Sequence, residues 1–327
     1  MRPASDRQSR LIVMMNPRKG AVIGCGFVGA ASAYTLMQSR LFSELVLIDV
    51  ANDKAVGEAM DISAGIPFAG PMDIYAGTYD DIKDAALVVV TAGANQKPGQ
   101  TRLDLVKTNV GIYRSIIPEI TKGGFDGILM IVSNPVDILT YAAVKLSGLP
   151  ENRVFGTGTV LDTARLKYRV GEMLGVNSQC VHAFIIGEHG DSEIPAWYCA
   201  NISGVPLSDY YELRGFHDRI KDAEAVAQEV RDSAYEIIKR KGATYYGIAM
   251  SVTELAGCVL RDERSIFSVS SMMHGLYDID DISLSMPAVV GRNGIEVVLP
   301  LDLSEAERDA LQNSAKMLKE IAATLDL

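Results

Sequence analysis

Three side chains in two short segments have the types needed to interconvert a 2-hydroxy acid and a 2-keto acid. His189 lies in Gly187-Glu-His-Gly-Asp-Ser192, 27 residues after Asp162, and Arg165 follows Asp162 by three. An imidazole exchanges a proton near neutral pH, and a neighbouring carboxylate orients it and stabilises its cation. A guanidinium binds a carboxylate through two parallel hydrogen bonds. The set predicts proton transfer on a small organic acid.

Each of these residues also has an ordinary structural explanation. A single histidine is more often structural than catalytic, and an acid and a base three residues apart on a helix are often a surface ion pair. Two observations favour the site. Gly187 and Gly190 flank His189, which indicates an exposed turn where backbone approaches a ligand closely. Gly156-Thr-Gly-Thr159 precedes Asp162 and indicates a helix that begins beside a cofactor crevice.

A dinucleotide that carries hydride would complete this chemistry, and Gly24-Cys-Gly-Phe-Val-Gly29 has the spacing that binds one. The spacing alone is weak evidence because the chain has 29 glycines, and the alternative is a structural turn without a ligand. Its context makes it specific: an apolar strand at 19–23 precedes it, a helix at 28–39 follows, and Asp49 ends the next strand. Asp49 favours NAD over NADP because its carboxylate would repel a 2′-phosphate. The residues therefore predict a nicotinamide-dependent 2-hydroxy acid dehydrogenase.

The first half of the chain alternates strands with helices, which predicts a doubly wound parallel sheet. Expected strands are 19–23, 45–49, 74–76, 86–91 and 128–132, with helices at 28–39, 54–62 and from about 102 to 120. Ligands bind at the carboxyl ends of such strands. Gly24, Asp49, Gly93 and Asn134 all lie at strand ends, so we expect them to face one crevice.

The second half predicts a mixed α+β substrate domain. Helices are expected at 218–241, 244–260 and 304–325, and Asn293-Gly294 predicts a β-hairpin between strands 289–292 and 295–299. The fold class is therefore α/β, an N-terminal Rossmann domain followed by a C-terminal α+β domain. We place the NAD-binding domain at 19–158 and the catalytic domain at 159–327. Residues 1–18 are expected to be a disordered tail, or to reflect a start assigned too far upstream, with Met14 or Met15 as the real first residue.

Composition limits the partners. A net charge of -10 without a basic stretch argues against nucleic acid and anionic membranes, and no apolar run reaches membrane-spanning length. The four cysteines, Cys25, Cys180, Cys199 and Cys258, lack pairing or metal-type spacing, which is typical of free thiols in a reducing cytosol. We expect a cytoplasmic protein without a metal.

A glycine-hinged polar segment, Thr91–Arg102, lies between a buried strand and a helix. Such segments often close over active sites, and the alternative is a mobile surface loop. On a closing lid, Arg102 would reach the substrate carbonyl and stabilise charge developing on its oxygen.

The chain from about Lys19 onward closely resembles the L-lactate dehydrogenase family, whose members are typically metal-free tetramers of anaerobic glycolysis and fermentation. The shared segments are Gly24–Gly29, Leu47–Asp49, Thr91–Leu105, Val132–Asp137, Val160–Arg165, Gly187–Glu193 and Lys241–Ile248. The resemblance implies His189 as proton donor and acceptor, Asp162 as its partner, Arg165 as carboxylate fork and Arg102 as carbonyl polariser. It implies substrate contacts at Gln96, Asn134 and Thr244. It places NAD on Gly24, Gly26, Val28, Gly29, Asp49, Lys54, Tyr79, Gly93, Ala94, Ser115, Val132, Asn134 and Thr157.

Substrate and regulation are less tightly specified. Pyruvate/L-lactate is the expected pair, with malate or a bulkier branched 2-hydroxy acid as alternatives, and a non-catalytic NAD-binding protein as an alternative of another class. Gln96 stands where malate-specific relatives carry an arginine, which favours pyruvate. In bacterial relatives activated by fructose 1,6-bisphosphate, the effector contacts an arginine and a histidine. The corresponding residues here are Lys167 and His182, so we expect weak or absent activation; the alternative for His182 is a structural strand residue.

Overall fold

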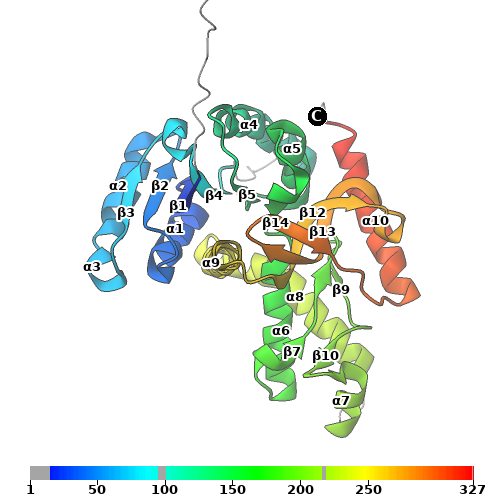
Figure 1. Ribbon diagram of the computed structural model, residues 1–327. Coiled ribbons are helices and arrows are strands. Elements are labelled where there is room, and N and C mark those ends of the chain that lie inside the picture. The colour runs from blue at the N-terminus through cyan, green and yellow to red at the C-terminus, as the bar shows by residue number, and fades with distance from the viewer. Residues whose placement is uncertain (1–14, 95–100, 216–218, 326) are drawn as a thin grey trace, which may run out of the picture.

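A nine-stranded sheet runs through the computed structural model, which describes residues 15–94, 101–215, 219–325 and 327. Its order is β14-β13-β12-β6-β5-β4-β1-β2-β3 (Figure 1). The parallel part comprises β1 (Asn16–Ile23), β2 (Glu44–Ile48), β3 (Asp73–Ala76), β4 (Ala85–Val90), β5 (Ile128–Ile131) and β6 (Val154–Gly156). The order 3-2-1-4-5-6 is that of a doubly wound dinucleotide fold. The predicted fold class is confirmed.

Helices cover both faces of the sheet. One face packs against α4 (Arg102–Lys122), α5 (Val136–Ser147) and α10 (Glu305–Ala322), and the other against α1 (Phe27–Ser39), α2 (Asn52–Ser63) and α9 (Tyr246–Arg261). Side chains of the central strands alternate accordingly: Val88 and Val90 lie in the first core, and Leu87 and Val89 in the second. A strand buried on both faces must be apolar throughout, which explains the run Ala85–Val90. Short connecting elements are α3 (Ile66–Ala69), η1 (Tyr79–Ile82) and η2 (Glu151–Arg153).

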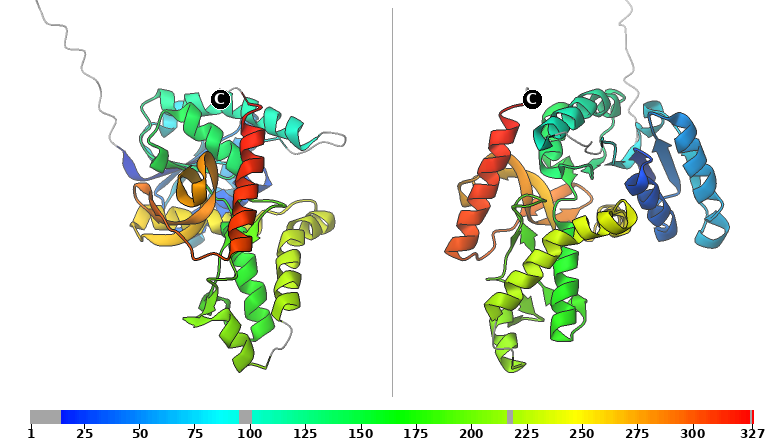
Figure 2. Two further views of the ribbon diagram at one scale, coloured as in Figure 1. Left: turned by 90° about the vertical axis from the view of Figure 1, so that its right-hand side faces the viewer. Right: turned by 180° about the vertical axis from the view of Figure 1, so that it is seen from behind.

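The second half both extends the sheet and forms a smaller lobe. Antiparallel strands β12 (Ser265–His274), β13 (Asp280–Gly291) and β14 (Gly294–Val298) continue the sheet beyond β6, with η4 (Leu276–Asp278) between the first two. The lobe holds α6 (Val160–Leu174), α7 (Leu207–Leu213) and α8 (Arg219–Lys241), with η3 (Ser178–Cys180) and five short strands: β7 (Val181–His182), β8 (Ile185–Ile186), β9 (Ile194–Pro195), β10 (Asn201–Ile202) and β11 (Val205–Pro206). Figure 2 shows α6 and α8 projecting side by side from the sheet.

Two expectations about strands need correction, and one strand was missed. The strand expected from Lys19 begins at Asn16, whose N–H donates to the Asp84 carbonyl at 2.6 Å, so residues 16–18 do not belong to a tail. Residues 1–14 lie outside the described part. The hairpin turn at Asn293-Gly294 is present, but its first strand starts at Asp280 rather than Val289. Strand β12 was not predicted.

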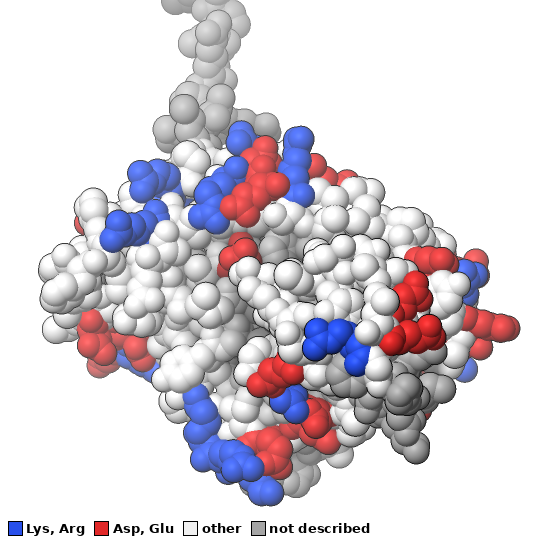
Figure 3. Space-filling model, turned by 90° about the horizontal axis from the view of Figure 1, so that it is seen from below, with Lys and Arg blue, Asp and Glu red and all other residues white. Residues whose placement is uncertain are grey.

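The face of the molecule drawn in Figure 3 carries charged side chains of both signs. Lys and Arg side chains lie among Asp and Glu side chains there, around a broad area without either. Among the described residues, no helix is both long and apolar enough to cross a bilayer. Cys25 and Cys258 are buried and Cys180 and Cys199 half-buried, and all four are free thiols.

Candidate active site

The structure brings His189, Asp162 and Arg165 together. Asp162 lies in the first turn of α6, and His189 lies in the loop between β8 and β9. His189 Nδ1 is 2.5 Å from Asp162 Oδ2, and Arg165 Nη1 is 3.0 Å from Asp162 Oδ1. The Asp162 side chain is only 4% exposed, so the alternative of a surface ion pair is wrong.

The electrostatics of this cluster favour a protonated histidine at neutral pH. Burial alone would lower the pKa of His189, but the charge and hydrogen bond of Asp162, together with the charges of Asp137 and Glu193, outweigh burial and raise that pKa to about 9. Burial likewise opposes ionisation of Asp162, yet His189 and Arg165 hold its pKa below the ordinary value. Because Nδ1 faces Asp162, Nε2 is the ring nitrogen left for a substrate.

The backbone of His189 is fixed by a residue that we did not predict. Its N–H donates to Oδ2 of Asp137, in the first turn of α5, at 2.7 Å. Ser270 of β12 donates its hydroxyl to the other oxygen of Asp137 at 2.6 Å. Burial raises the pKa of Asp137 to about 6. Gly187, two residues before His189, forms a backbone bridge with Ser285 of β13. The loop is thus attached to α5, α6 and β13.

The glycines of the dinucleotide motif have separate roles. Gly24 has φ +94°, and a Cβ on Gly29 would lie 1.8 Å from the Gly24 carbonyl oxygen, so both are required by the turn itself. A Cβ on Gly26 would meet no atom within 4 Å, and Gly26 caps α1 without a side-chain hydrogen bond. There is therefore open space beside Gly26 at the N-terminus of α1, and a helix N-terminus with such space fits a pyrophosphate.

The strand ends carry the expected residues. Asp49 accepts the N–H of Cys25 at 2.6 Å and that of Ala51 at 2.9 Å, so its carboxylate ties the end of β2 to the glycine turn. Asn109 of α4 joins two further loops: it accepts the N–H of Ala94 at 2.7 Å and donates to the Asn134 carbonyl at 2.8 Å. Asn109 was not predicted, and it aligns the loops after β4 and β5.

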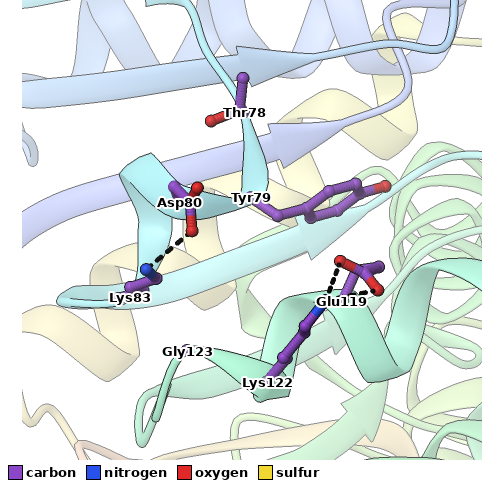
Figure 4. A pocket seen from close by; sticks show the side chains of 7 residues that line it. All are labelled: Thr78, Tyr79, Asp80, Lys83, Glu119, Lys122 and Gly123. Atoms are coloured by element: carbon purple, nitrogen blue, oxygen red, sulfur yellow. Dashed lines mark hydrogen bonds and ion pairs between the residues drawn. The ribbon is translucent and has the colours of Figure 1, made fainter.

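Other expected cofactor contacts are spread around these ends. Gly93 follows β4, Val132 is buried after β5, Thr157 is buried after β6, Val28 is half-buried in α1, and Lys54 is exposed in the first turn of α2. Ser115 is exposed on α4, where its hydroxyl donates to the Ile112 carbonyl. Tyr79 belongs to η1, and Figure 4 shows its side chain extending over a pocket of about 480 Å³ between η1 and the C-terminal end of α4. The contacts of these residues with NAD stay predictions.

The remaining substrate residues are placed less completely. Arg102 is the first residue of α4, and Gln96, like the lid from 95 to 100, lies outside the described residues. Thr244 lies between α8 and α9. Its neighbour Tyr245 stacks on Phe27 of the dinucleotide turn with ring centroids 5.5 Å apart, so this segment borders the cofactor region.

Arg165 also lines a pocket of about 450 Å³ between α6 and α8, to which Ser233 and Ile237 contribute. The two residues proposed for an effector lie on the same lobe. Lys167 is half-buried on α6, and His182 is exposed on β7 and paired with Asn201 of β10.

Sequence reasoning missed Asp137, Ser270, Asn109 and Glu193. Glu193 is buried near the catalytic pair. A ring nitrogen of His189 and one carboxylate oxygen each from Asp162 and Glu193 all lie within 4.8 Å of one another. Asp137 had a signal, because it is the one charged residue near the start of the apolar helix 136–147. Glu193 had none that separates it from a surface acid.

Comparison with known proteins agrees with this arrangement. Residues 18–156 match the NAD-binding domain of the lactate/malate dehydrogenases, and residues 159–325 match their α/β C-terminal domain. An L-lactate dehydrogenase of Thermoanaerobacterium saccharolyticum is 49% identical over 94% of this chain and 99% of its own length. One of Acetivibrio thermocellus is 48% identical over 95% and 98%.

Solved structures give the same result. A ligand-bound minor L-lactate dehydrogenase of Enterococcus mundtii superposes with a TM-score of 0.92 at 44% identity, covering 95% of this chain and 99% of that one. A lactate dehydrogenase from a Medee basin deep-sea metagenome library gives 0.91 at 44% identity with the same coverage. With both domains matched over nearly its full length, the chain belongs to the lactate/malate dehydrogenase family.

Proposed function

We propose that this chain is an NAD-dependent L-lactate dehydrogenase, which transfers hydride reversibly between NADH and pyruvate to give (S)-lactate. The observation that carries the proposal is the pairing of half-buried His189 with buried Asp162, 2.5 Å apart, in a chain whose first half is an NAD-binding domain. Curated relatives at 47–49% identity carry the name L-lactate dehydrogenase, which supports pyruvate as substrate.

Bound NADH supplies the hydride for the carbonyl carbon. His189, cationic because of Asp162, donates a proton from Nε2 to the oxygen that becomes the lactate hydroxyl. Arg165 keeps one donor on Asp162, and its remaining N–H groups bind the substrate carboxylate. Arg102 stabilises the developing negative charge on the carbonyl oxygen. Asn134 and Thr244 complete the substrate contacts.

Selection of the substrate is assigned to Gln96. A neutral glutamine over oxaloacetate would bury the second carboxylate without a cation, at a cost on the order of several kcal/mol. Pyruvate presents a methyl group there and avoids this cost. We expect pyruvate to be preferred by roughly a hundredfold or more in kcat/KM, and Gln96→Arg to move activity toward oxaloacetate.

The test follows NADH absorbance with pyruvate, oxaloacetate and 2-ketoisocaproate in parallel, for the parent, Gln96→Arg and His189→Ala. His189→Ala should abolish turnover but leave NADH binding nearly intact, because other residues build the dinucleotide turn. Equal rates with pyruvate and oxaloacetate in the parent would remove Gln96 as selector and the lactate assignment with it. Near-parental turnover by His189→Ala would refute the catalytic assignment.

We also propose a cytoplasmic homotetramer that fructose 1,6-bisphosphate activates weakly or not at all. Large apolar side chains on α2, α3 and α9, Met60, Phe68 and Met250, are 60–88% exposed, as expected of a face that another subunit covers. Lys167 supplies positive charge but not a bidentate fork for a phosphate. Sedimentation velocity tests the assembly, and strong activation at micromolar effector would contradict the proposal about regulation.

A further inference from the structure

Glu193 is a buried carboxyl group that the reaction described above does not use. It follows His189 by four residues in the β8–β9 loop, and its backbone N–H donates to the Gly190 carbonyl at 3.1 Å, which folds the loop back toward His189. The residue is 7% exposed, and its Oε1 is buried without a hydrogen-bond partner among the described residues. Such an oxygen is costly to bury, so its presence calls for an explanation.

The surroundings of Glu193 indicate what that function is. One atom of each of Glu193, His189 and Asp162 lie within 4.8 Å of one another. A cation is a poor occupant of this cluster, because His189 Nδ1 and Asp162 Oδ2 are already 2.5 Å apart and Arg165 neutralises the other oxygen of Asp162. Two carboxylates this close cannot both ionise easily, so a proton on Glu193 satisfies the cluster instead.

We propose that Glu193 is a positioning residue of the reaction, a second buried carboxyl group whose charge, when present, retains the proton on His189. It acts through His189 and not on the substrate. The proposal rests on the role of His189 proposed above.

Among the described side chains, the charged groups that act on Glu193 are Asp162 and Arg165 from α6, His189 from its own loop, and Arg231 from α8. Burial, and then the charge of Asp162, raise the pKa of Glu193 to about 8, while the three cations oppose the rise. The carboxyl group is therefore neutral at pH 7 and becomes an anion in the range where His189 starts to lose its proton. An anion formed there opposes that loss, so the pH range of the protonated histidine extends upward.

The test is the pH dependence of kcat/KM for pyruvate in Glu193→Gln, which removes the charge and keeps the shape. The break in the profile should move to lower pH by about two units, the size expected of a charge a few ångströms away at the effective dielectric of a protein interior. The break for lactate oxidation should move in the same direction. Glu224→Gln, the same change at an exposed position of α8, should leave both breaks in place.

A merely structural role would lower the plateau of the profile without moving its break, so a folded, active Glu193→Gln enzyme with unmoved breaks overturns the proposal. If the variant fails to fold, the parent labelled with ¹³C at glutamate side-chain carboxyls gives the answer, because one glutamate must titrate near pH 8. Absence of any glutamate that titrates above pH 7 also overturns it. Failure of the proposed function is recognised separately, by retained turnover in His189→Ala.

Discussion

Asp137 and His189, 52 residues apart, are joined by a hydrogen bond from the His189 backbone N–H to Asp137 Oδ2 at 2.7 Å. The ring of His189 is bound by α6 and its backbone by α5, so the proton-transfer group is oriented from two elements at once. Ser270 completes this arrangement by donating to the second oxygen of Asp137. The position of the imidazole therefore depends on a buried carboxyl group that holds its backbone and not its ring.

Replacing Asp137 with Asn should change how stability depends on pH. Burial raises the pKa of Asp137 from 3.8 to about 6, so between these values the folded state keeps a proton that the unfolded chain has released. The contribution of Asp137 to stability is fully present below the lower value and is lost as the pH rises through the upper one. Relative to Asp137→Asn, the parent should lose up to about 3 kcal/mol over that range.

Urea unfolding of both proteins at pH 4.5 and pH 7.5 measures this difference. Asp209→Asn, an exposed acid on α7, is the control and should show no comparable change. A stability difference between parent and Asp137→Asn that is the same at both pH values would contradict burial of the charge.

Asp162→Asn should lower the pH at which His189 loses its proton. Without the Asp162 carboxylate, burial opposes the protonated form of His189 while the charges of Asp137 and Glu193 still favour it, so the pKa of His189 should fall well below about 9. The break in kcat/KM for pyruvate should shift down by two pH units or more, with at least a roughly tenfold loss at pH 8 and weaker keto-acid binding. Glu172→Gln is the matched control, since Glu172 also pairs with an arginine three residues away on α6. An unmoved break would separate Asp162 from the chemistry.

Two glycines of the dinucleotide turn should respond in opposite ways to alanine. Gly26→Ala adds a methyl group to open space, so the Tm should stay within about 2 °C while NADH affinity falls about tenfold or more. Gly29→Ala places its methyl group against the Gly24 carbonyl and should cost about 3 kcal/mol or more of stability. Thermal melts and NADH fluorescence titrations of both variants measure these effects. Unchanged NADH affinity in Gly26→Ala would place the pyrophosphate elsewhere.

A chain that starts at Met15 should fold, assemble and turn over like the full chain. It retains all of β1, including the bond from Asn16 N–H to the Asp84 carbonyl. A chain that starts at Lys19 removes this bond and should lose about 1 kcal/mol of stability. Melting curves, sedimentation and kcat/KM of the three chains decide this. Loss of assembly in the Met15 chain would mean that residues 1–14 reach a neighbouring subunit.

The sequence predicted the crevice because parallel topology alone brings strand ends together. The residues after β1, β2, β4 and β5 are Gly24, Asp49, Gly93 and Asn134. They could be placed on one edge of the sheet without knowing how the strands are aligned with one another. Long helices with clear apolar periodicity, such as α8 and α10, were predicted to within a few residues for the same reason: their signal is local.

Strand β12 was missed because four of its residues are serines, three of them buried. Two of the buried hydroxyls have tertiary partners: Ser270 donates to Asp137, and Ser268 donates to the Ile185 carbonyl at 2.6 Å. Neither partner is near in sequence, so the segment does not resemble a buried strand on its own. The burial of Asp162 and Glu193 escaped prediction similarly, because it depends on contacts between separate elements.

Strands β6 and β12 pair at Gly156 and Ser270, so separating the N-terminal half from the C-terminal half breaks this pairing. A Cβ on Gly156 would lie 3.1 Å from that of Ser270 and 2.3 Å from the Thr140 hydroxyl, so the two strands adjoin with no room for a side chain. An N-terminal fragment ending near residue 158 would leave β6 as a bare edge with unpaired backbone groups and an exposed apolar surface. Such an edge recruits further strands, so the fragment should self-associate rather than stay a dispersed monomer.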